Sequence, residues 1–385
     1  MTKPTPALRE MMSSLIATPS ISCSRPDLDM SNQAVIDQLA DWCESAGFRC
    51  QRQAVAPGKF NLVATLGQGE GGLVLSGHTD TVPCDESLWS SDPFRLEERD
   101  GRLYGLGSCD MKSFLAMALT ASQDFPAERY RRPLVLVATC DEETSMSGAR
   151  LLAESGKSLG RYCVIGEPTD LTPVREHKGI LMEAIRFLGQ SGHSSDPALG
   201  NSALEGMHRF MTCLLNLRDE LQGRYRNEAF AVAVPTLNLG HIHGGDNPNR
   251  ICGDCELHID LRFLPGMDIA ELRQQIRDLA RETAAEQGLQ FTAETLFEGV
   301  PALHTPADSD LNLYLQEATE RQSRAVAFGT EAPFYNQMGC ETIVIGPGSI
   351  DQAHQPDEFL PIEQIAPTLK LLRSLIHRYC IEPQT

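Results

Sequence analysis

Histidines and acidic residues occur together at several short intervals of this chain, and both residue types bind catalytic metal ions. These places are His78–Asp80, Asp110, Asp141–Glu143, Glu167–Thr169 and His354–Glu358. Imidazole and carboxylate ligands without a thiolate suit zinc or a similar first-row divalent ion. One tetrahedral ion that keeps one position open for catalysis needs only three protein ligands. Three carboxylates and two imidazoles are more than that. They therefore suit two ions about 3.5–4 Å apart that share a bridging carboxylate and activate water for hydrolysis.

The elements that would position these side chains are short apolar strands. Four predicted strands each lead into one of the acidic or histidine-containing segments, three of them directly and the last through a Gly-Pro-Gly turn. They are residues 72–77, 133–140, 162–166 and 342–346. Asp110 follows a glycine-rich turn and directly precedes a helix predicted at 111–122. Ligands of open α/β sheets bind beyond the carboxyl ends of the strands. One such segment alone is usually an ordinary loop, but their shared position predicts a single metal centre.

The spacing of His78 and Asp80 predicts a supporting role for the aspartate. The two residues are two apart, so in an extended segment their side chains project to the same side. We expect the Asp80 carboxylate to accept the second ring N–H of His78 and so to fix the tautomer of the imidazole.

The order of the predicted elements indicates an α/β fold with a mostly parallel central sheet flanked by helices. From about residue 180 the order becomes β-α-β-β-α-β, which is typical of ferredoxin-like domains. The predicted strands there begin near residues 180, 236, 251 and 289, and the helices are residues 202–221 and 269–286. We therefore predict a catalytic domain in two segments, 1–178 and 291–385, and an inserted α+β lid or dimerisation domain at 179–290.

Composition excludes several classes of protein. The formal net charge of −19 argues against non-specific nucleic-acid binding, which needs clustered Lys and Arg. The longest apolar runs, such as LVLVATC, are too short to span a membrane. The first residues, MTKPTPALREMMSS, lack the apolar core of a secretory signal. The 12 cysteines are scattered and are interpreted as reduced thiols, so we expect a cytoplasmic protein.

Several longer runs resemble a known family. GHTDTVP, YGLGSCDMK, DEETSMSGAR, GEPT, SGHSSDP and GPGSIDQAHQPDE are similar to the motifs of the aminoacylase and succinyl-diaminopimelate desuccinylase family of dinuclear zinc hydrolases. The runs REHKG, TLNLGHIHGGD, NRICGDCELHIDLR and GTEAPF resemble one bacterial subgroup of deacetylases in that family. The similarity covers essentially the whole chain in order.

The resemblance implies a role for each candidate ligand. His78 and Glu167 would hold one zinc ion, and Glu143 and His354 would hold the other. Asp110 would bridge the two ions. Cobalt could substitute for zinc, because such ligands accept either ion.

The resemblance also implies catalytic and substrate-binding residues. Glu142 would be the general base, and Asp80 would orient His78. His193, in the inserted domain, would enter the active site of the neighbouring subunit of a homodimer. Asn249 and Arg262 would bind the carboxylate of the substrate. Glu331 is a further candidate, for a cationic substrate side chain.

The implied activity is hydrolysis of N2-acetyl-L-ornithine to L-ornithine and acetate in arginine biosynthesis. The partner would thus be a small N-acyl amino acid, with no nucleic acid and no membrane. Deacetylation of acetylcitrulline, desuccinylation and aminoacylase activity remain open, because a sequence does not measure pocket contacts. A non-catalytic metal protein would have lost a ligand or the base, and none is lost. A thiol enzyme is a further alternative, but the sequence contains no convincing Cys–His motif for one. Cys109 beside Asp110 is the closest candidate for its nucleophile.

Overall fold

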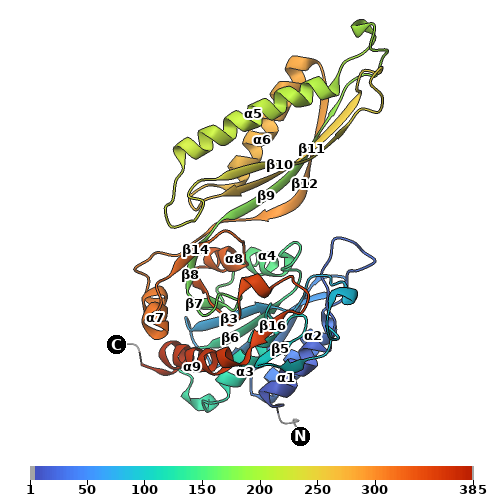
Figure 1. The fold of residues 1–385 in the computed structure, drawn as a ribbon. Coiled ribbons are helices and arrows are strands. Elements are labelled where there is room, and N and C mark those ends of the chain that lie inside the picture. Colours follow the sequence, from blue (N-terminus) through green and yellow to red (C-terminus); the bar gives the residue numbers. More distant parts are fainter. Residues whose placement is uncertain (1–4, 384–385) are drawn as a thin grey trace. The chain divides into compact units, whose positions relative to one another are not determined.

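The computed structural model describes residues 5–383, in which contacts define two compact units (Figure 1). Unit 1 comprises the described residues up to Arg175, those of Thr305–Arg324 and those from Thr330 onwards. Unit 2 comprises Glu176–His304 and Ala325–Gly329. The predicted ranges 1–178, 179–290 and 291–385 stay predictions, and their first four and last two residues lie outside the described part of the chain.

The sheet of unit 1 is parallel at its centre. Six neighbouring strands of this nine-stranded sheet are, in spatial order, β1 (Arg49–Ala56), β2 (Lys59–Leu66), β6 (Leu134–Thr139), β3 (Leu73–His78), β7 (Tyr162–Ile165) and β15 (Glu341–Val344). The pairs β6–β3, β3–β7 and β7–β15 are parallel, whereas β1 and β2 extend the sheet in the antiparallel sense. β3, β6, β7 and β15 are the four strands predicted to run into the candidate ligands, and every residue of β3 and β6 is buried.

Helices cover both faces of this sheet, which explains why its central strands are continuously apolar. The helices of unit 1 are α1 (Leu8–Ile16), α2 (Gln33–Ser45), α3 (Lys112–Ser122), α4 (Ser147–Glu154), α7 (Asp310–Thr319), α8 (Ala332–Gln337) and α9 (Ile365–Ile376). Figure 1 shows α1, α3 and α9 on one face and α4 and α8 on the other. The prediction of an α/β fold with a mostly parallel central sheet is confirmed.

Two small elements complete unit 1. β4 (Glu97–Arg99), β5 (Arg102–Tyr104) and β16 (Phe359–Pro361) form a separate antiparallel sheet. The chain passes to unit 2 within β8 (Val174–His177), whose Val174 pairs with β15 and whose last residues pair with β13 (Leu303–His304). It passes there a second time within β14 (Arg324–Val326).

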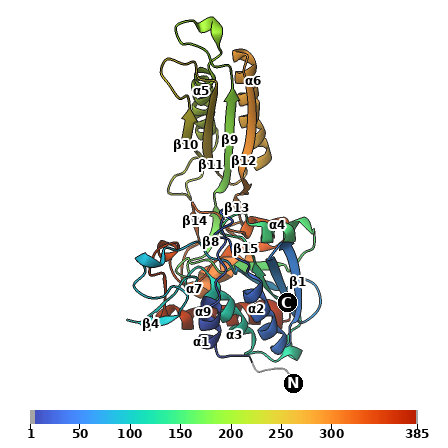
Figure 2. The ribbon, with the colours of Figure 1, turned by 90° about the vertical axis from the view of Figure 1, so that its right-hand side faces the viewer.

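Unit 2 has the predicted β-α-β-β-α-β order. Its elements are β9 (Gly179–Leu188), α5 (Ala203–Arg224), β10 (Thr236–Gly244), β11 (Asp254–Phe263), α6 (Ile269–Gln287) and β12 (Gln290–Val300). The antiparallel sheet has the order β10-β11-β9-β12, which is a ferredoxin-like arrangement. Residues of β11 alternate between buried and half-buried, because one face packs on α5 and α6 (Figure 2). Among residues 5–383 no helix combines the length and the apolar composition needed to cross a membrane.

Candidate active site

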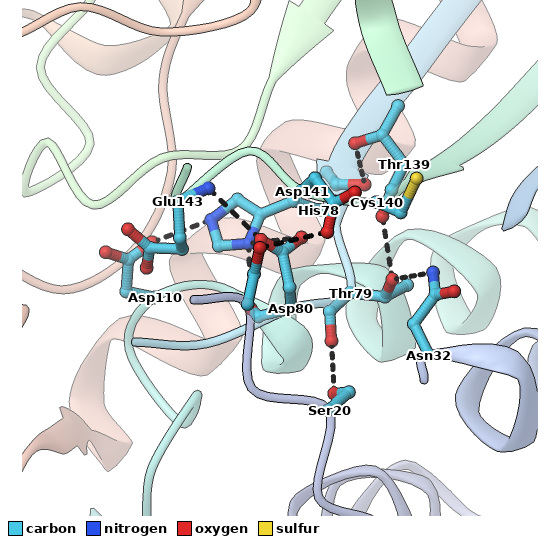
Figure 3. Close-up of polar contacts among 12 residues, drawn as sticks. Ser20, Asn32, His78, Thr79, Asp80, Asp110, Thr139, Cys140, Asp141 and Glu143 are labelled. Atoms are coloured by element: carbon cyan, nitrogen blue, oxygen red, sulfur yellow. Dashed lines mark hydrogen bonds and ion pairs between the residues drawn. The ribbon is translucent and has the colours of Figure 1, made fainter. Parts of the chain in front are cut away.

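His78 lies at the carboxyl end of β3, next to Thr139 at the end of β6 (Figure 3). Its side chain is 1% exposed. Its Nε2 atom lies 3.0 Å from Asp110 Oδ1 and 3.9 Å from Glu167 Oε1. The structure therefore brings together three candidate ligands from separate segments of the chain.

The expected contact between His78 and the Asp80 carboxylate is replaced by a backbone contact. His78 Nδ1 lies 2.9 Å from the Asp80 carbonyl oxygen and 3.8 Å from the carboxylate atom Oδ1. The other carboxylate oxygen, Oδ2, accepts the backbone N–H of Glu143 at 3.1 Å. The carbonyl thus occupies the position expected for the carboxylate, and the carboxylate binds the loop that carries Glu143.

Asp110 lies between the two histidines. While Oδ1 faces His78, Oδ2 lies 3.5 Å from His354 Nε2. The glycine-rich turn before Asp110 is fixed by Glu358, whose carboxylate accepts the backbone N–H groups of Gly107, Cys109 and Asp110 at 3.1, 2.8 and 2.9 Å. Both oxygens of Asp110 are therefore directed at different imidazoles, as a bridging ligand requires.

The remaining candidates complete two overlapping clusters. The ligand atoms of His78, Asp110 and Glu143 lie within 4.8 Å of one another, as do those of His78, Glu142 and Glu167. His354 Nε2 lies 2.9 Å from Glu143 Oε2, and its half-exposed ring comes from the loop before β16. All these residues belong to unit 1.

Crowding of buried carboxylates controls the ionisation of this centre. Burial raises the pKa of Glu142, and repulsion from Glu167 raises it further. Burial and repulsion from Asp110 raise the pKa values of Glu143 and Glu167. Burial would also raise the pKa of Asp110, but hydrogen bonds from His354 and His78 outweigh it and lower the value. The three glutamates therefore hold a proton more readily than free glutamates do, whereas Asp110 releases its proton more readily than a free aspartate.

Comparison with known proteins connects this geometry to a family. The model of the peptidase family M20/M25/M40 matches residues 74–378. A protein of Edwardsiella ictaluri named acetylornithine deacetylase is 48% identical over 377 residues, which is 97% of this chain and 98% of the relative. The chain belongs to the M20/M25/M40 peptidase family.

Two solved structures share the fold. An aminopeptidase PepT from Bacillus cereus aligns with a TM-score of 0.75 at 17% identity, over 97% of this chain and 98% of that one. A dinuclear metal-binding M20 peptidase from Bacillus subtilis aligns with a TM-score of 0.65 at 14% identity, over 97% of each chain. At these identities the likeness concerns the fold alone.

The residues of the centre fit divalent cations. Glu167 Oε1 is buried and has no hydrogen-bond partner among the described residues. Burying an unpaired carboxylate oxygen is costly, and a cation beside it removes that cost. The donor set of imidazole and carboxylate groups suits zinc, cobalt or manganese.

The other predicted site residues lie in unit 2. His193 is in the loop after β9, where its Nδ1 atom lies 2.7 Å from Ser195 Oγ. Asn249 is close by, since its carbonyl accepts the N–H of Ser194 at 3.0 Å. Arg262, near the end of β11, forms an ion pair of 2.9 Å with Asp260. The structure therefore groups His193 with Asn249 but not with Arg262.

Sequence reasoning assigned no role to Glu358. Its function in holding the Asp110 turn follows only from contacts across 248 or more residues of sequence. Its position four residues after His354 was the only available signal. Glu331 lies at the start of α8, where its Oε2 atom accepts a hydrogen bond of 2.9 Å from Thr139 Oγ1. Its role toward a cationic substrate stays a prediction.

Proposed function

We propose that this protein is a metal-dependent amidohydrolase that converts N2-acetyl-L-ornithine to L-ornithine and acetate in the cytoplasmic biosynthesis of arginine. The observation that carries the substrate is the 48% identity, over nearly the full length of both chains, to a relative named acetylornithine deacetylase. The chemistry is supported by the buried cluster of His78, Asp110 and Glu143, in a family that includes a dinuclear metal-binding peptidase.

Two divalent ions, zinc or cobalt, would be held by five side chains. His78 and Glu167 would bind one ion, Glu143 and His354 the other, and Asp110 both. Such ions, when bound, polarise a carbonyl oxygen and lower the pKa of water toward neutrality. The two directions in which the Asp110 oxygens face support the bridging role.

Glu142 would act as the proton carrier of the reaction. It takes a proton from the attacking water and delivers it to the nitrogen of the leaving amine. Burial and the neighbouring Glu167 raise its pKa, and a raised pKa brings a carboxylate closer to the pH at which transfer in both directions is efficient. Asp80 holds the adjacent Glu143 through its backbone N–H.

Residues of two subunits would together bind the substrate. His193 would donate to the acyl oxygen, while Asn249 and Arg262 would bind the substrate carboxylate. Arg262 pairs with Ile180 at the start of β9, whereas Asp254 pairs with Leu188 at its end, before the loop of His193. Eight residues of strand separate these ends by about 26 Å. A small substrate cannot bridge that distance, so His193 and Arg262 can contact the same substrate only if they come from different copies of the chain. This supports a homodimer.

The first experiment compares substrates. Acetate release from N-acetyl-L-ornithine by the metal-reconstituted enzyme is measured beside acetylcitrulline, acetylmethionine and N-succinyl-diaminopimelate. We expect preferred turnover of acetylornithine, and a loss of kcat of about 10²–10⁴-fold in Glu142→Ala, the range for a general base. Glu154→Ala, an exposed glutamate on α4, is the control. Preference for another substrate would assign the protein to a sister activity.

A second experiment tests the shared site. Glu142→Ala and His193→Ala chains are co-expressed with different tags, and the hybrid dimers are purified. Each hybrid would contain one complete site of two, so the purified hybrids should have about half of wild-type activity, and an unfractionated mixture formed by random association about a quarter. If the hybrids are as inactive as each parent variant, His193 does not act in the neighbouring subunit.

A further inference from the structure

The loop that carries Glu142 and Glu143 begins with a backbone conformation that few residues adopt. Asp141, two residues after the end of β6, has a φ of 57°. The left-handed region costs most L-residues about 1–2 kcal/mol, and aspartate is one of the more tolerant types. The carbonyl oxygen of Asp141 accepts the N–H groups of Ser145 and Met146 at 3.0 and 2.6 Å. The turn at Asp141 therefore determines where the next two side chains point.

A buried lysine holds the side chain of Asp141. Lys59, the first residue of β2, is 6% exposed, and its Nζ atom lies 2.8 Å from Asp141 Oδ1 and 2.7 Å from Asp29 Oδ1. The same aspartate accepts hydrogen bonds from Ser22 Oγ at 2.9 Å and from Ser147 Oγ at 3.1 Å. Burial lowers the pKa of Lys59, but its bonds to the two aspartates outweigh burial and raise it, so Lys59 stays charged.

A second residue of β2 holds both ends of the same loop. Asn61 lies two residues after Lys59, on the same face of the strand, and is fully buried. Its Oδ1 atom accepts the N–H of Cys140 at 3.3 Å, and its Nδ2 atom donates to the carbonyl of Gly148 at 2.9 Å. β2 thus contacts residues 140, 141 and 148 through two adjacent side chains.

We propose that Lys59 is a positioning residue, which with Asn61 holds the 140–148 loop so that Glu142 and Glu143 keep fixed places in the metal centre. The inference rests on the proposed function for the roles of those two glutamates. A proton carrier displaced by about 1 Å loses about 100-fold in rate, so the loop has to be rigid. Without Lys59, Asp141 would be a buried carboxylate with only two hydroxyl donors, and the left-handed turn would lose its charged partner.

The test is Lys59→Met in the full chain, assayed at saturating metal. We expect kcat to fall by about 10–100-fold, the range for residues that orient metal ligands, while KM stays within about twofold because Lys59 does not touch the substrate site. Lys59→Arg should recover most of kcat. Arg52→Met is the matched control, because Arg52 on neighbouring β1 also forms ion pairs, with Asp37 and Glu44 of α2, yet has no contact with the loop.

Titration with Co²⁺, followed by its visible absorption, gives a readout that needs no substrate. We expect Lys59→Met to bind the weaker of the two ions about 10–100-fold less tightly, since Glu143 lies on the loop. If the wild-type protein hydrolyses none of the substrates, the proposed function fails while this titration still decides the role of Lys59.

Asp141→Asn connects the effect to the loop and guards against misfolding of the methionine variant, because asparagine also tolerates the left-handed turn. If Lys59 acts through Asp141, adding Lys59→Met to Asp141→Asn should reduce kcat and Co²⁺ affinity little further. Fully multiplicative losses in the double variant, or wild-type kcat and Co²⁺ affinity in Lys59→Met, would overturn the proposal.

Discussion

Glu331 illustrates how burial changes a single carboxyl group. It is 1% exposed, one oxygen accepts from Thr139, and the other has no hydrogen-bond partner in the described part of the chain. Burial raises its pKa to about 8, against the opposing effects of His78 and Thr139. The folded protein therefore holds a proton that the unfolded chain, with the ordinary value of 4.5, releases.

This difference predicts how stability depends on pH. Because the pKa of Glu331 is raised in the folded state, its contribution to stability is fully present below pH 4.5 and is lost as pH rises toward 8. The loss amounts to at most about 1.4 kcal/mol per pH unit. We expect Glu331→Gln to remove this dependence, so the stability of the variant relative to wild type should increase between pH 5 and 8. Urea unfolding of the metal-depleted proteins at both pH values measures it.

The exposed Glu154→Gln serves as the control for this measurement and should give the same difference at both pH values. If wild type and Glu331→Gln differ in stability by the same amount at pH 5 and at pH 8, the prediction is contradicted.

The contact between His78 and Asp80 shows the limit of arguments from spacing. The carbonyl oxygen of Asp80, and not its carboxylate, faces His78 Nδ1. Spacing gives the side to which a residue projects but not which of its oxygens is closer.

At the scale of elements, the junction between β7 and Glu167 depends on a glycine. Gly166 donates its N–H to the carbonyl of Ser76 at 3.0 Å, and a Cβ atom at this position would overlap the ring of Phe114 on α3. The helix and the strand can approach so closely only because residue 166 has no side chain. The same approach places Glu167 beside His78.

We expect Gly166→Ala to destabilise the protein by about 1–3 kcal/mol, because the added methyl group overpacks the contact with Phe114. It should also reduce the amount of bound metal, since Glu167 moves with the strand end. Thermal unfolding and metal analysis measure the two effects. The double variant Gly166→Ala/Phe114→Ala should lose less free energy of unfolding than the sum of the losses in the two single variants. Simple additivity would show that the ring is not the obstacle.

The buried strands were predictable at this scale, whereas the edge elements were not. β3, β6, β7 and β15 are short apolar runs, and burial on both faces requires such a composition. β1 is largely exposed, with the burial pattern of an edge strand, and β4, β5 and β16 have three residues each. Strands that short or that polar leave too weak a pattern to be distinguished from loops.

At the scale of the molecule, unit 2 has a core of its own. Side chains of its strands and of α5 and α6 form one cluster, which includes Phe187 and Phe210. The fully buried Glu183 forms ion pairs with Arg273 at 2.8 Å and Arg277 at 2.6 Å. Both the apolar contacts and this charged group are completed within the unit.

We therefore expect a fragment of residues 176–304 to fold without unit 1. Its circular dichroism should show both helix and antiparallel sheet, and urea should unfold it in one cooperative transition. Glu183→Ala in the fragment leaves two arginines without their buried partner, which typically costs about 3–5 kcal/mol, and should abolish or strongly shift the transition. A fragment with a coil-like spectrum would show that unit 2 depends on the rest of the chain.

The sequence alone determined the class of fold, the β-α-β-β-α-β order of the inserted segment and the segments that carry the ligands. These are local properties, because strand burial and the residues at a strand end are read within a few positions. Tertiary structure alone decided which groups meet. Lys59 reaches Asp141 across β2 and β6, and Glu358 holds the Asp110 turn from 248 residues away. Such contacts depend on the closure of long loops and on packing between distant elements, and local sequence patterns encode neither of them.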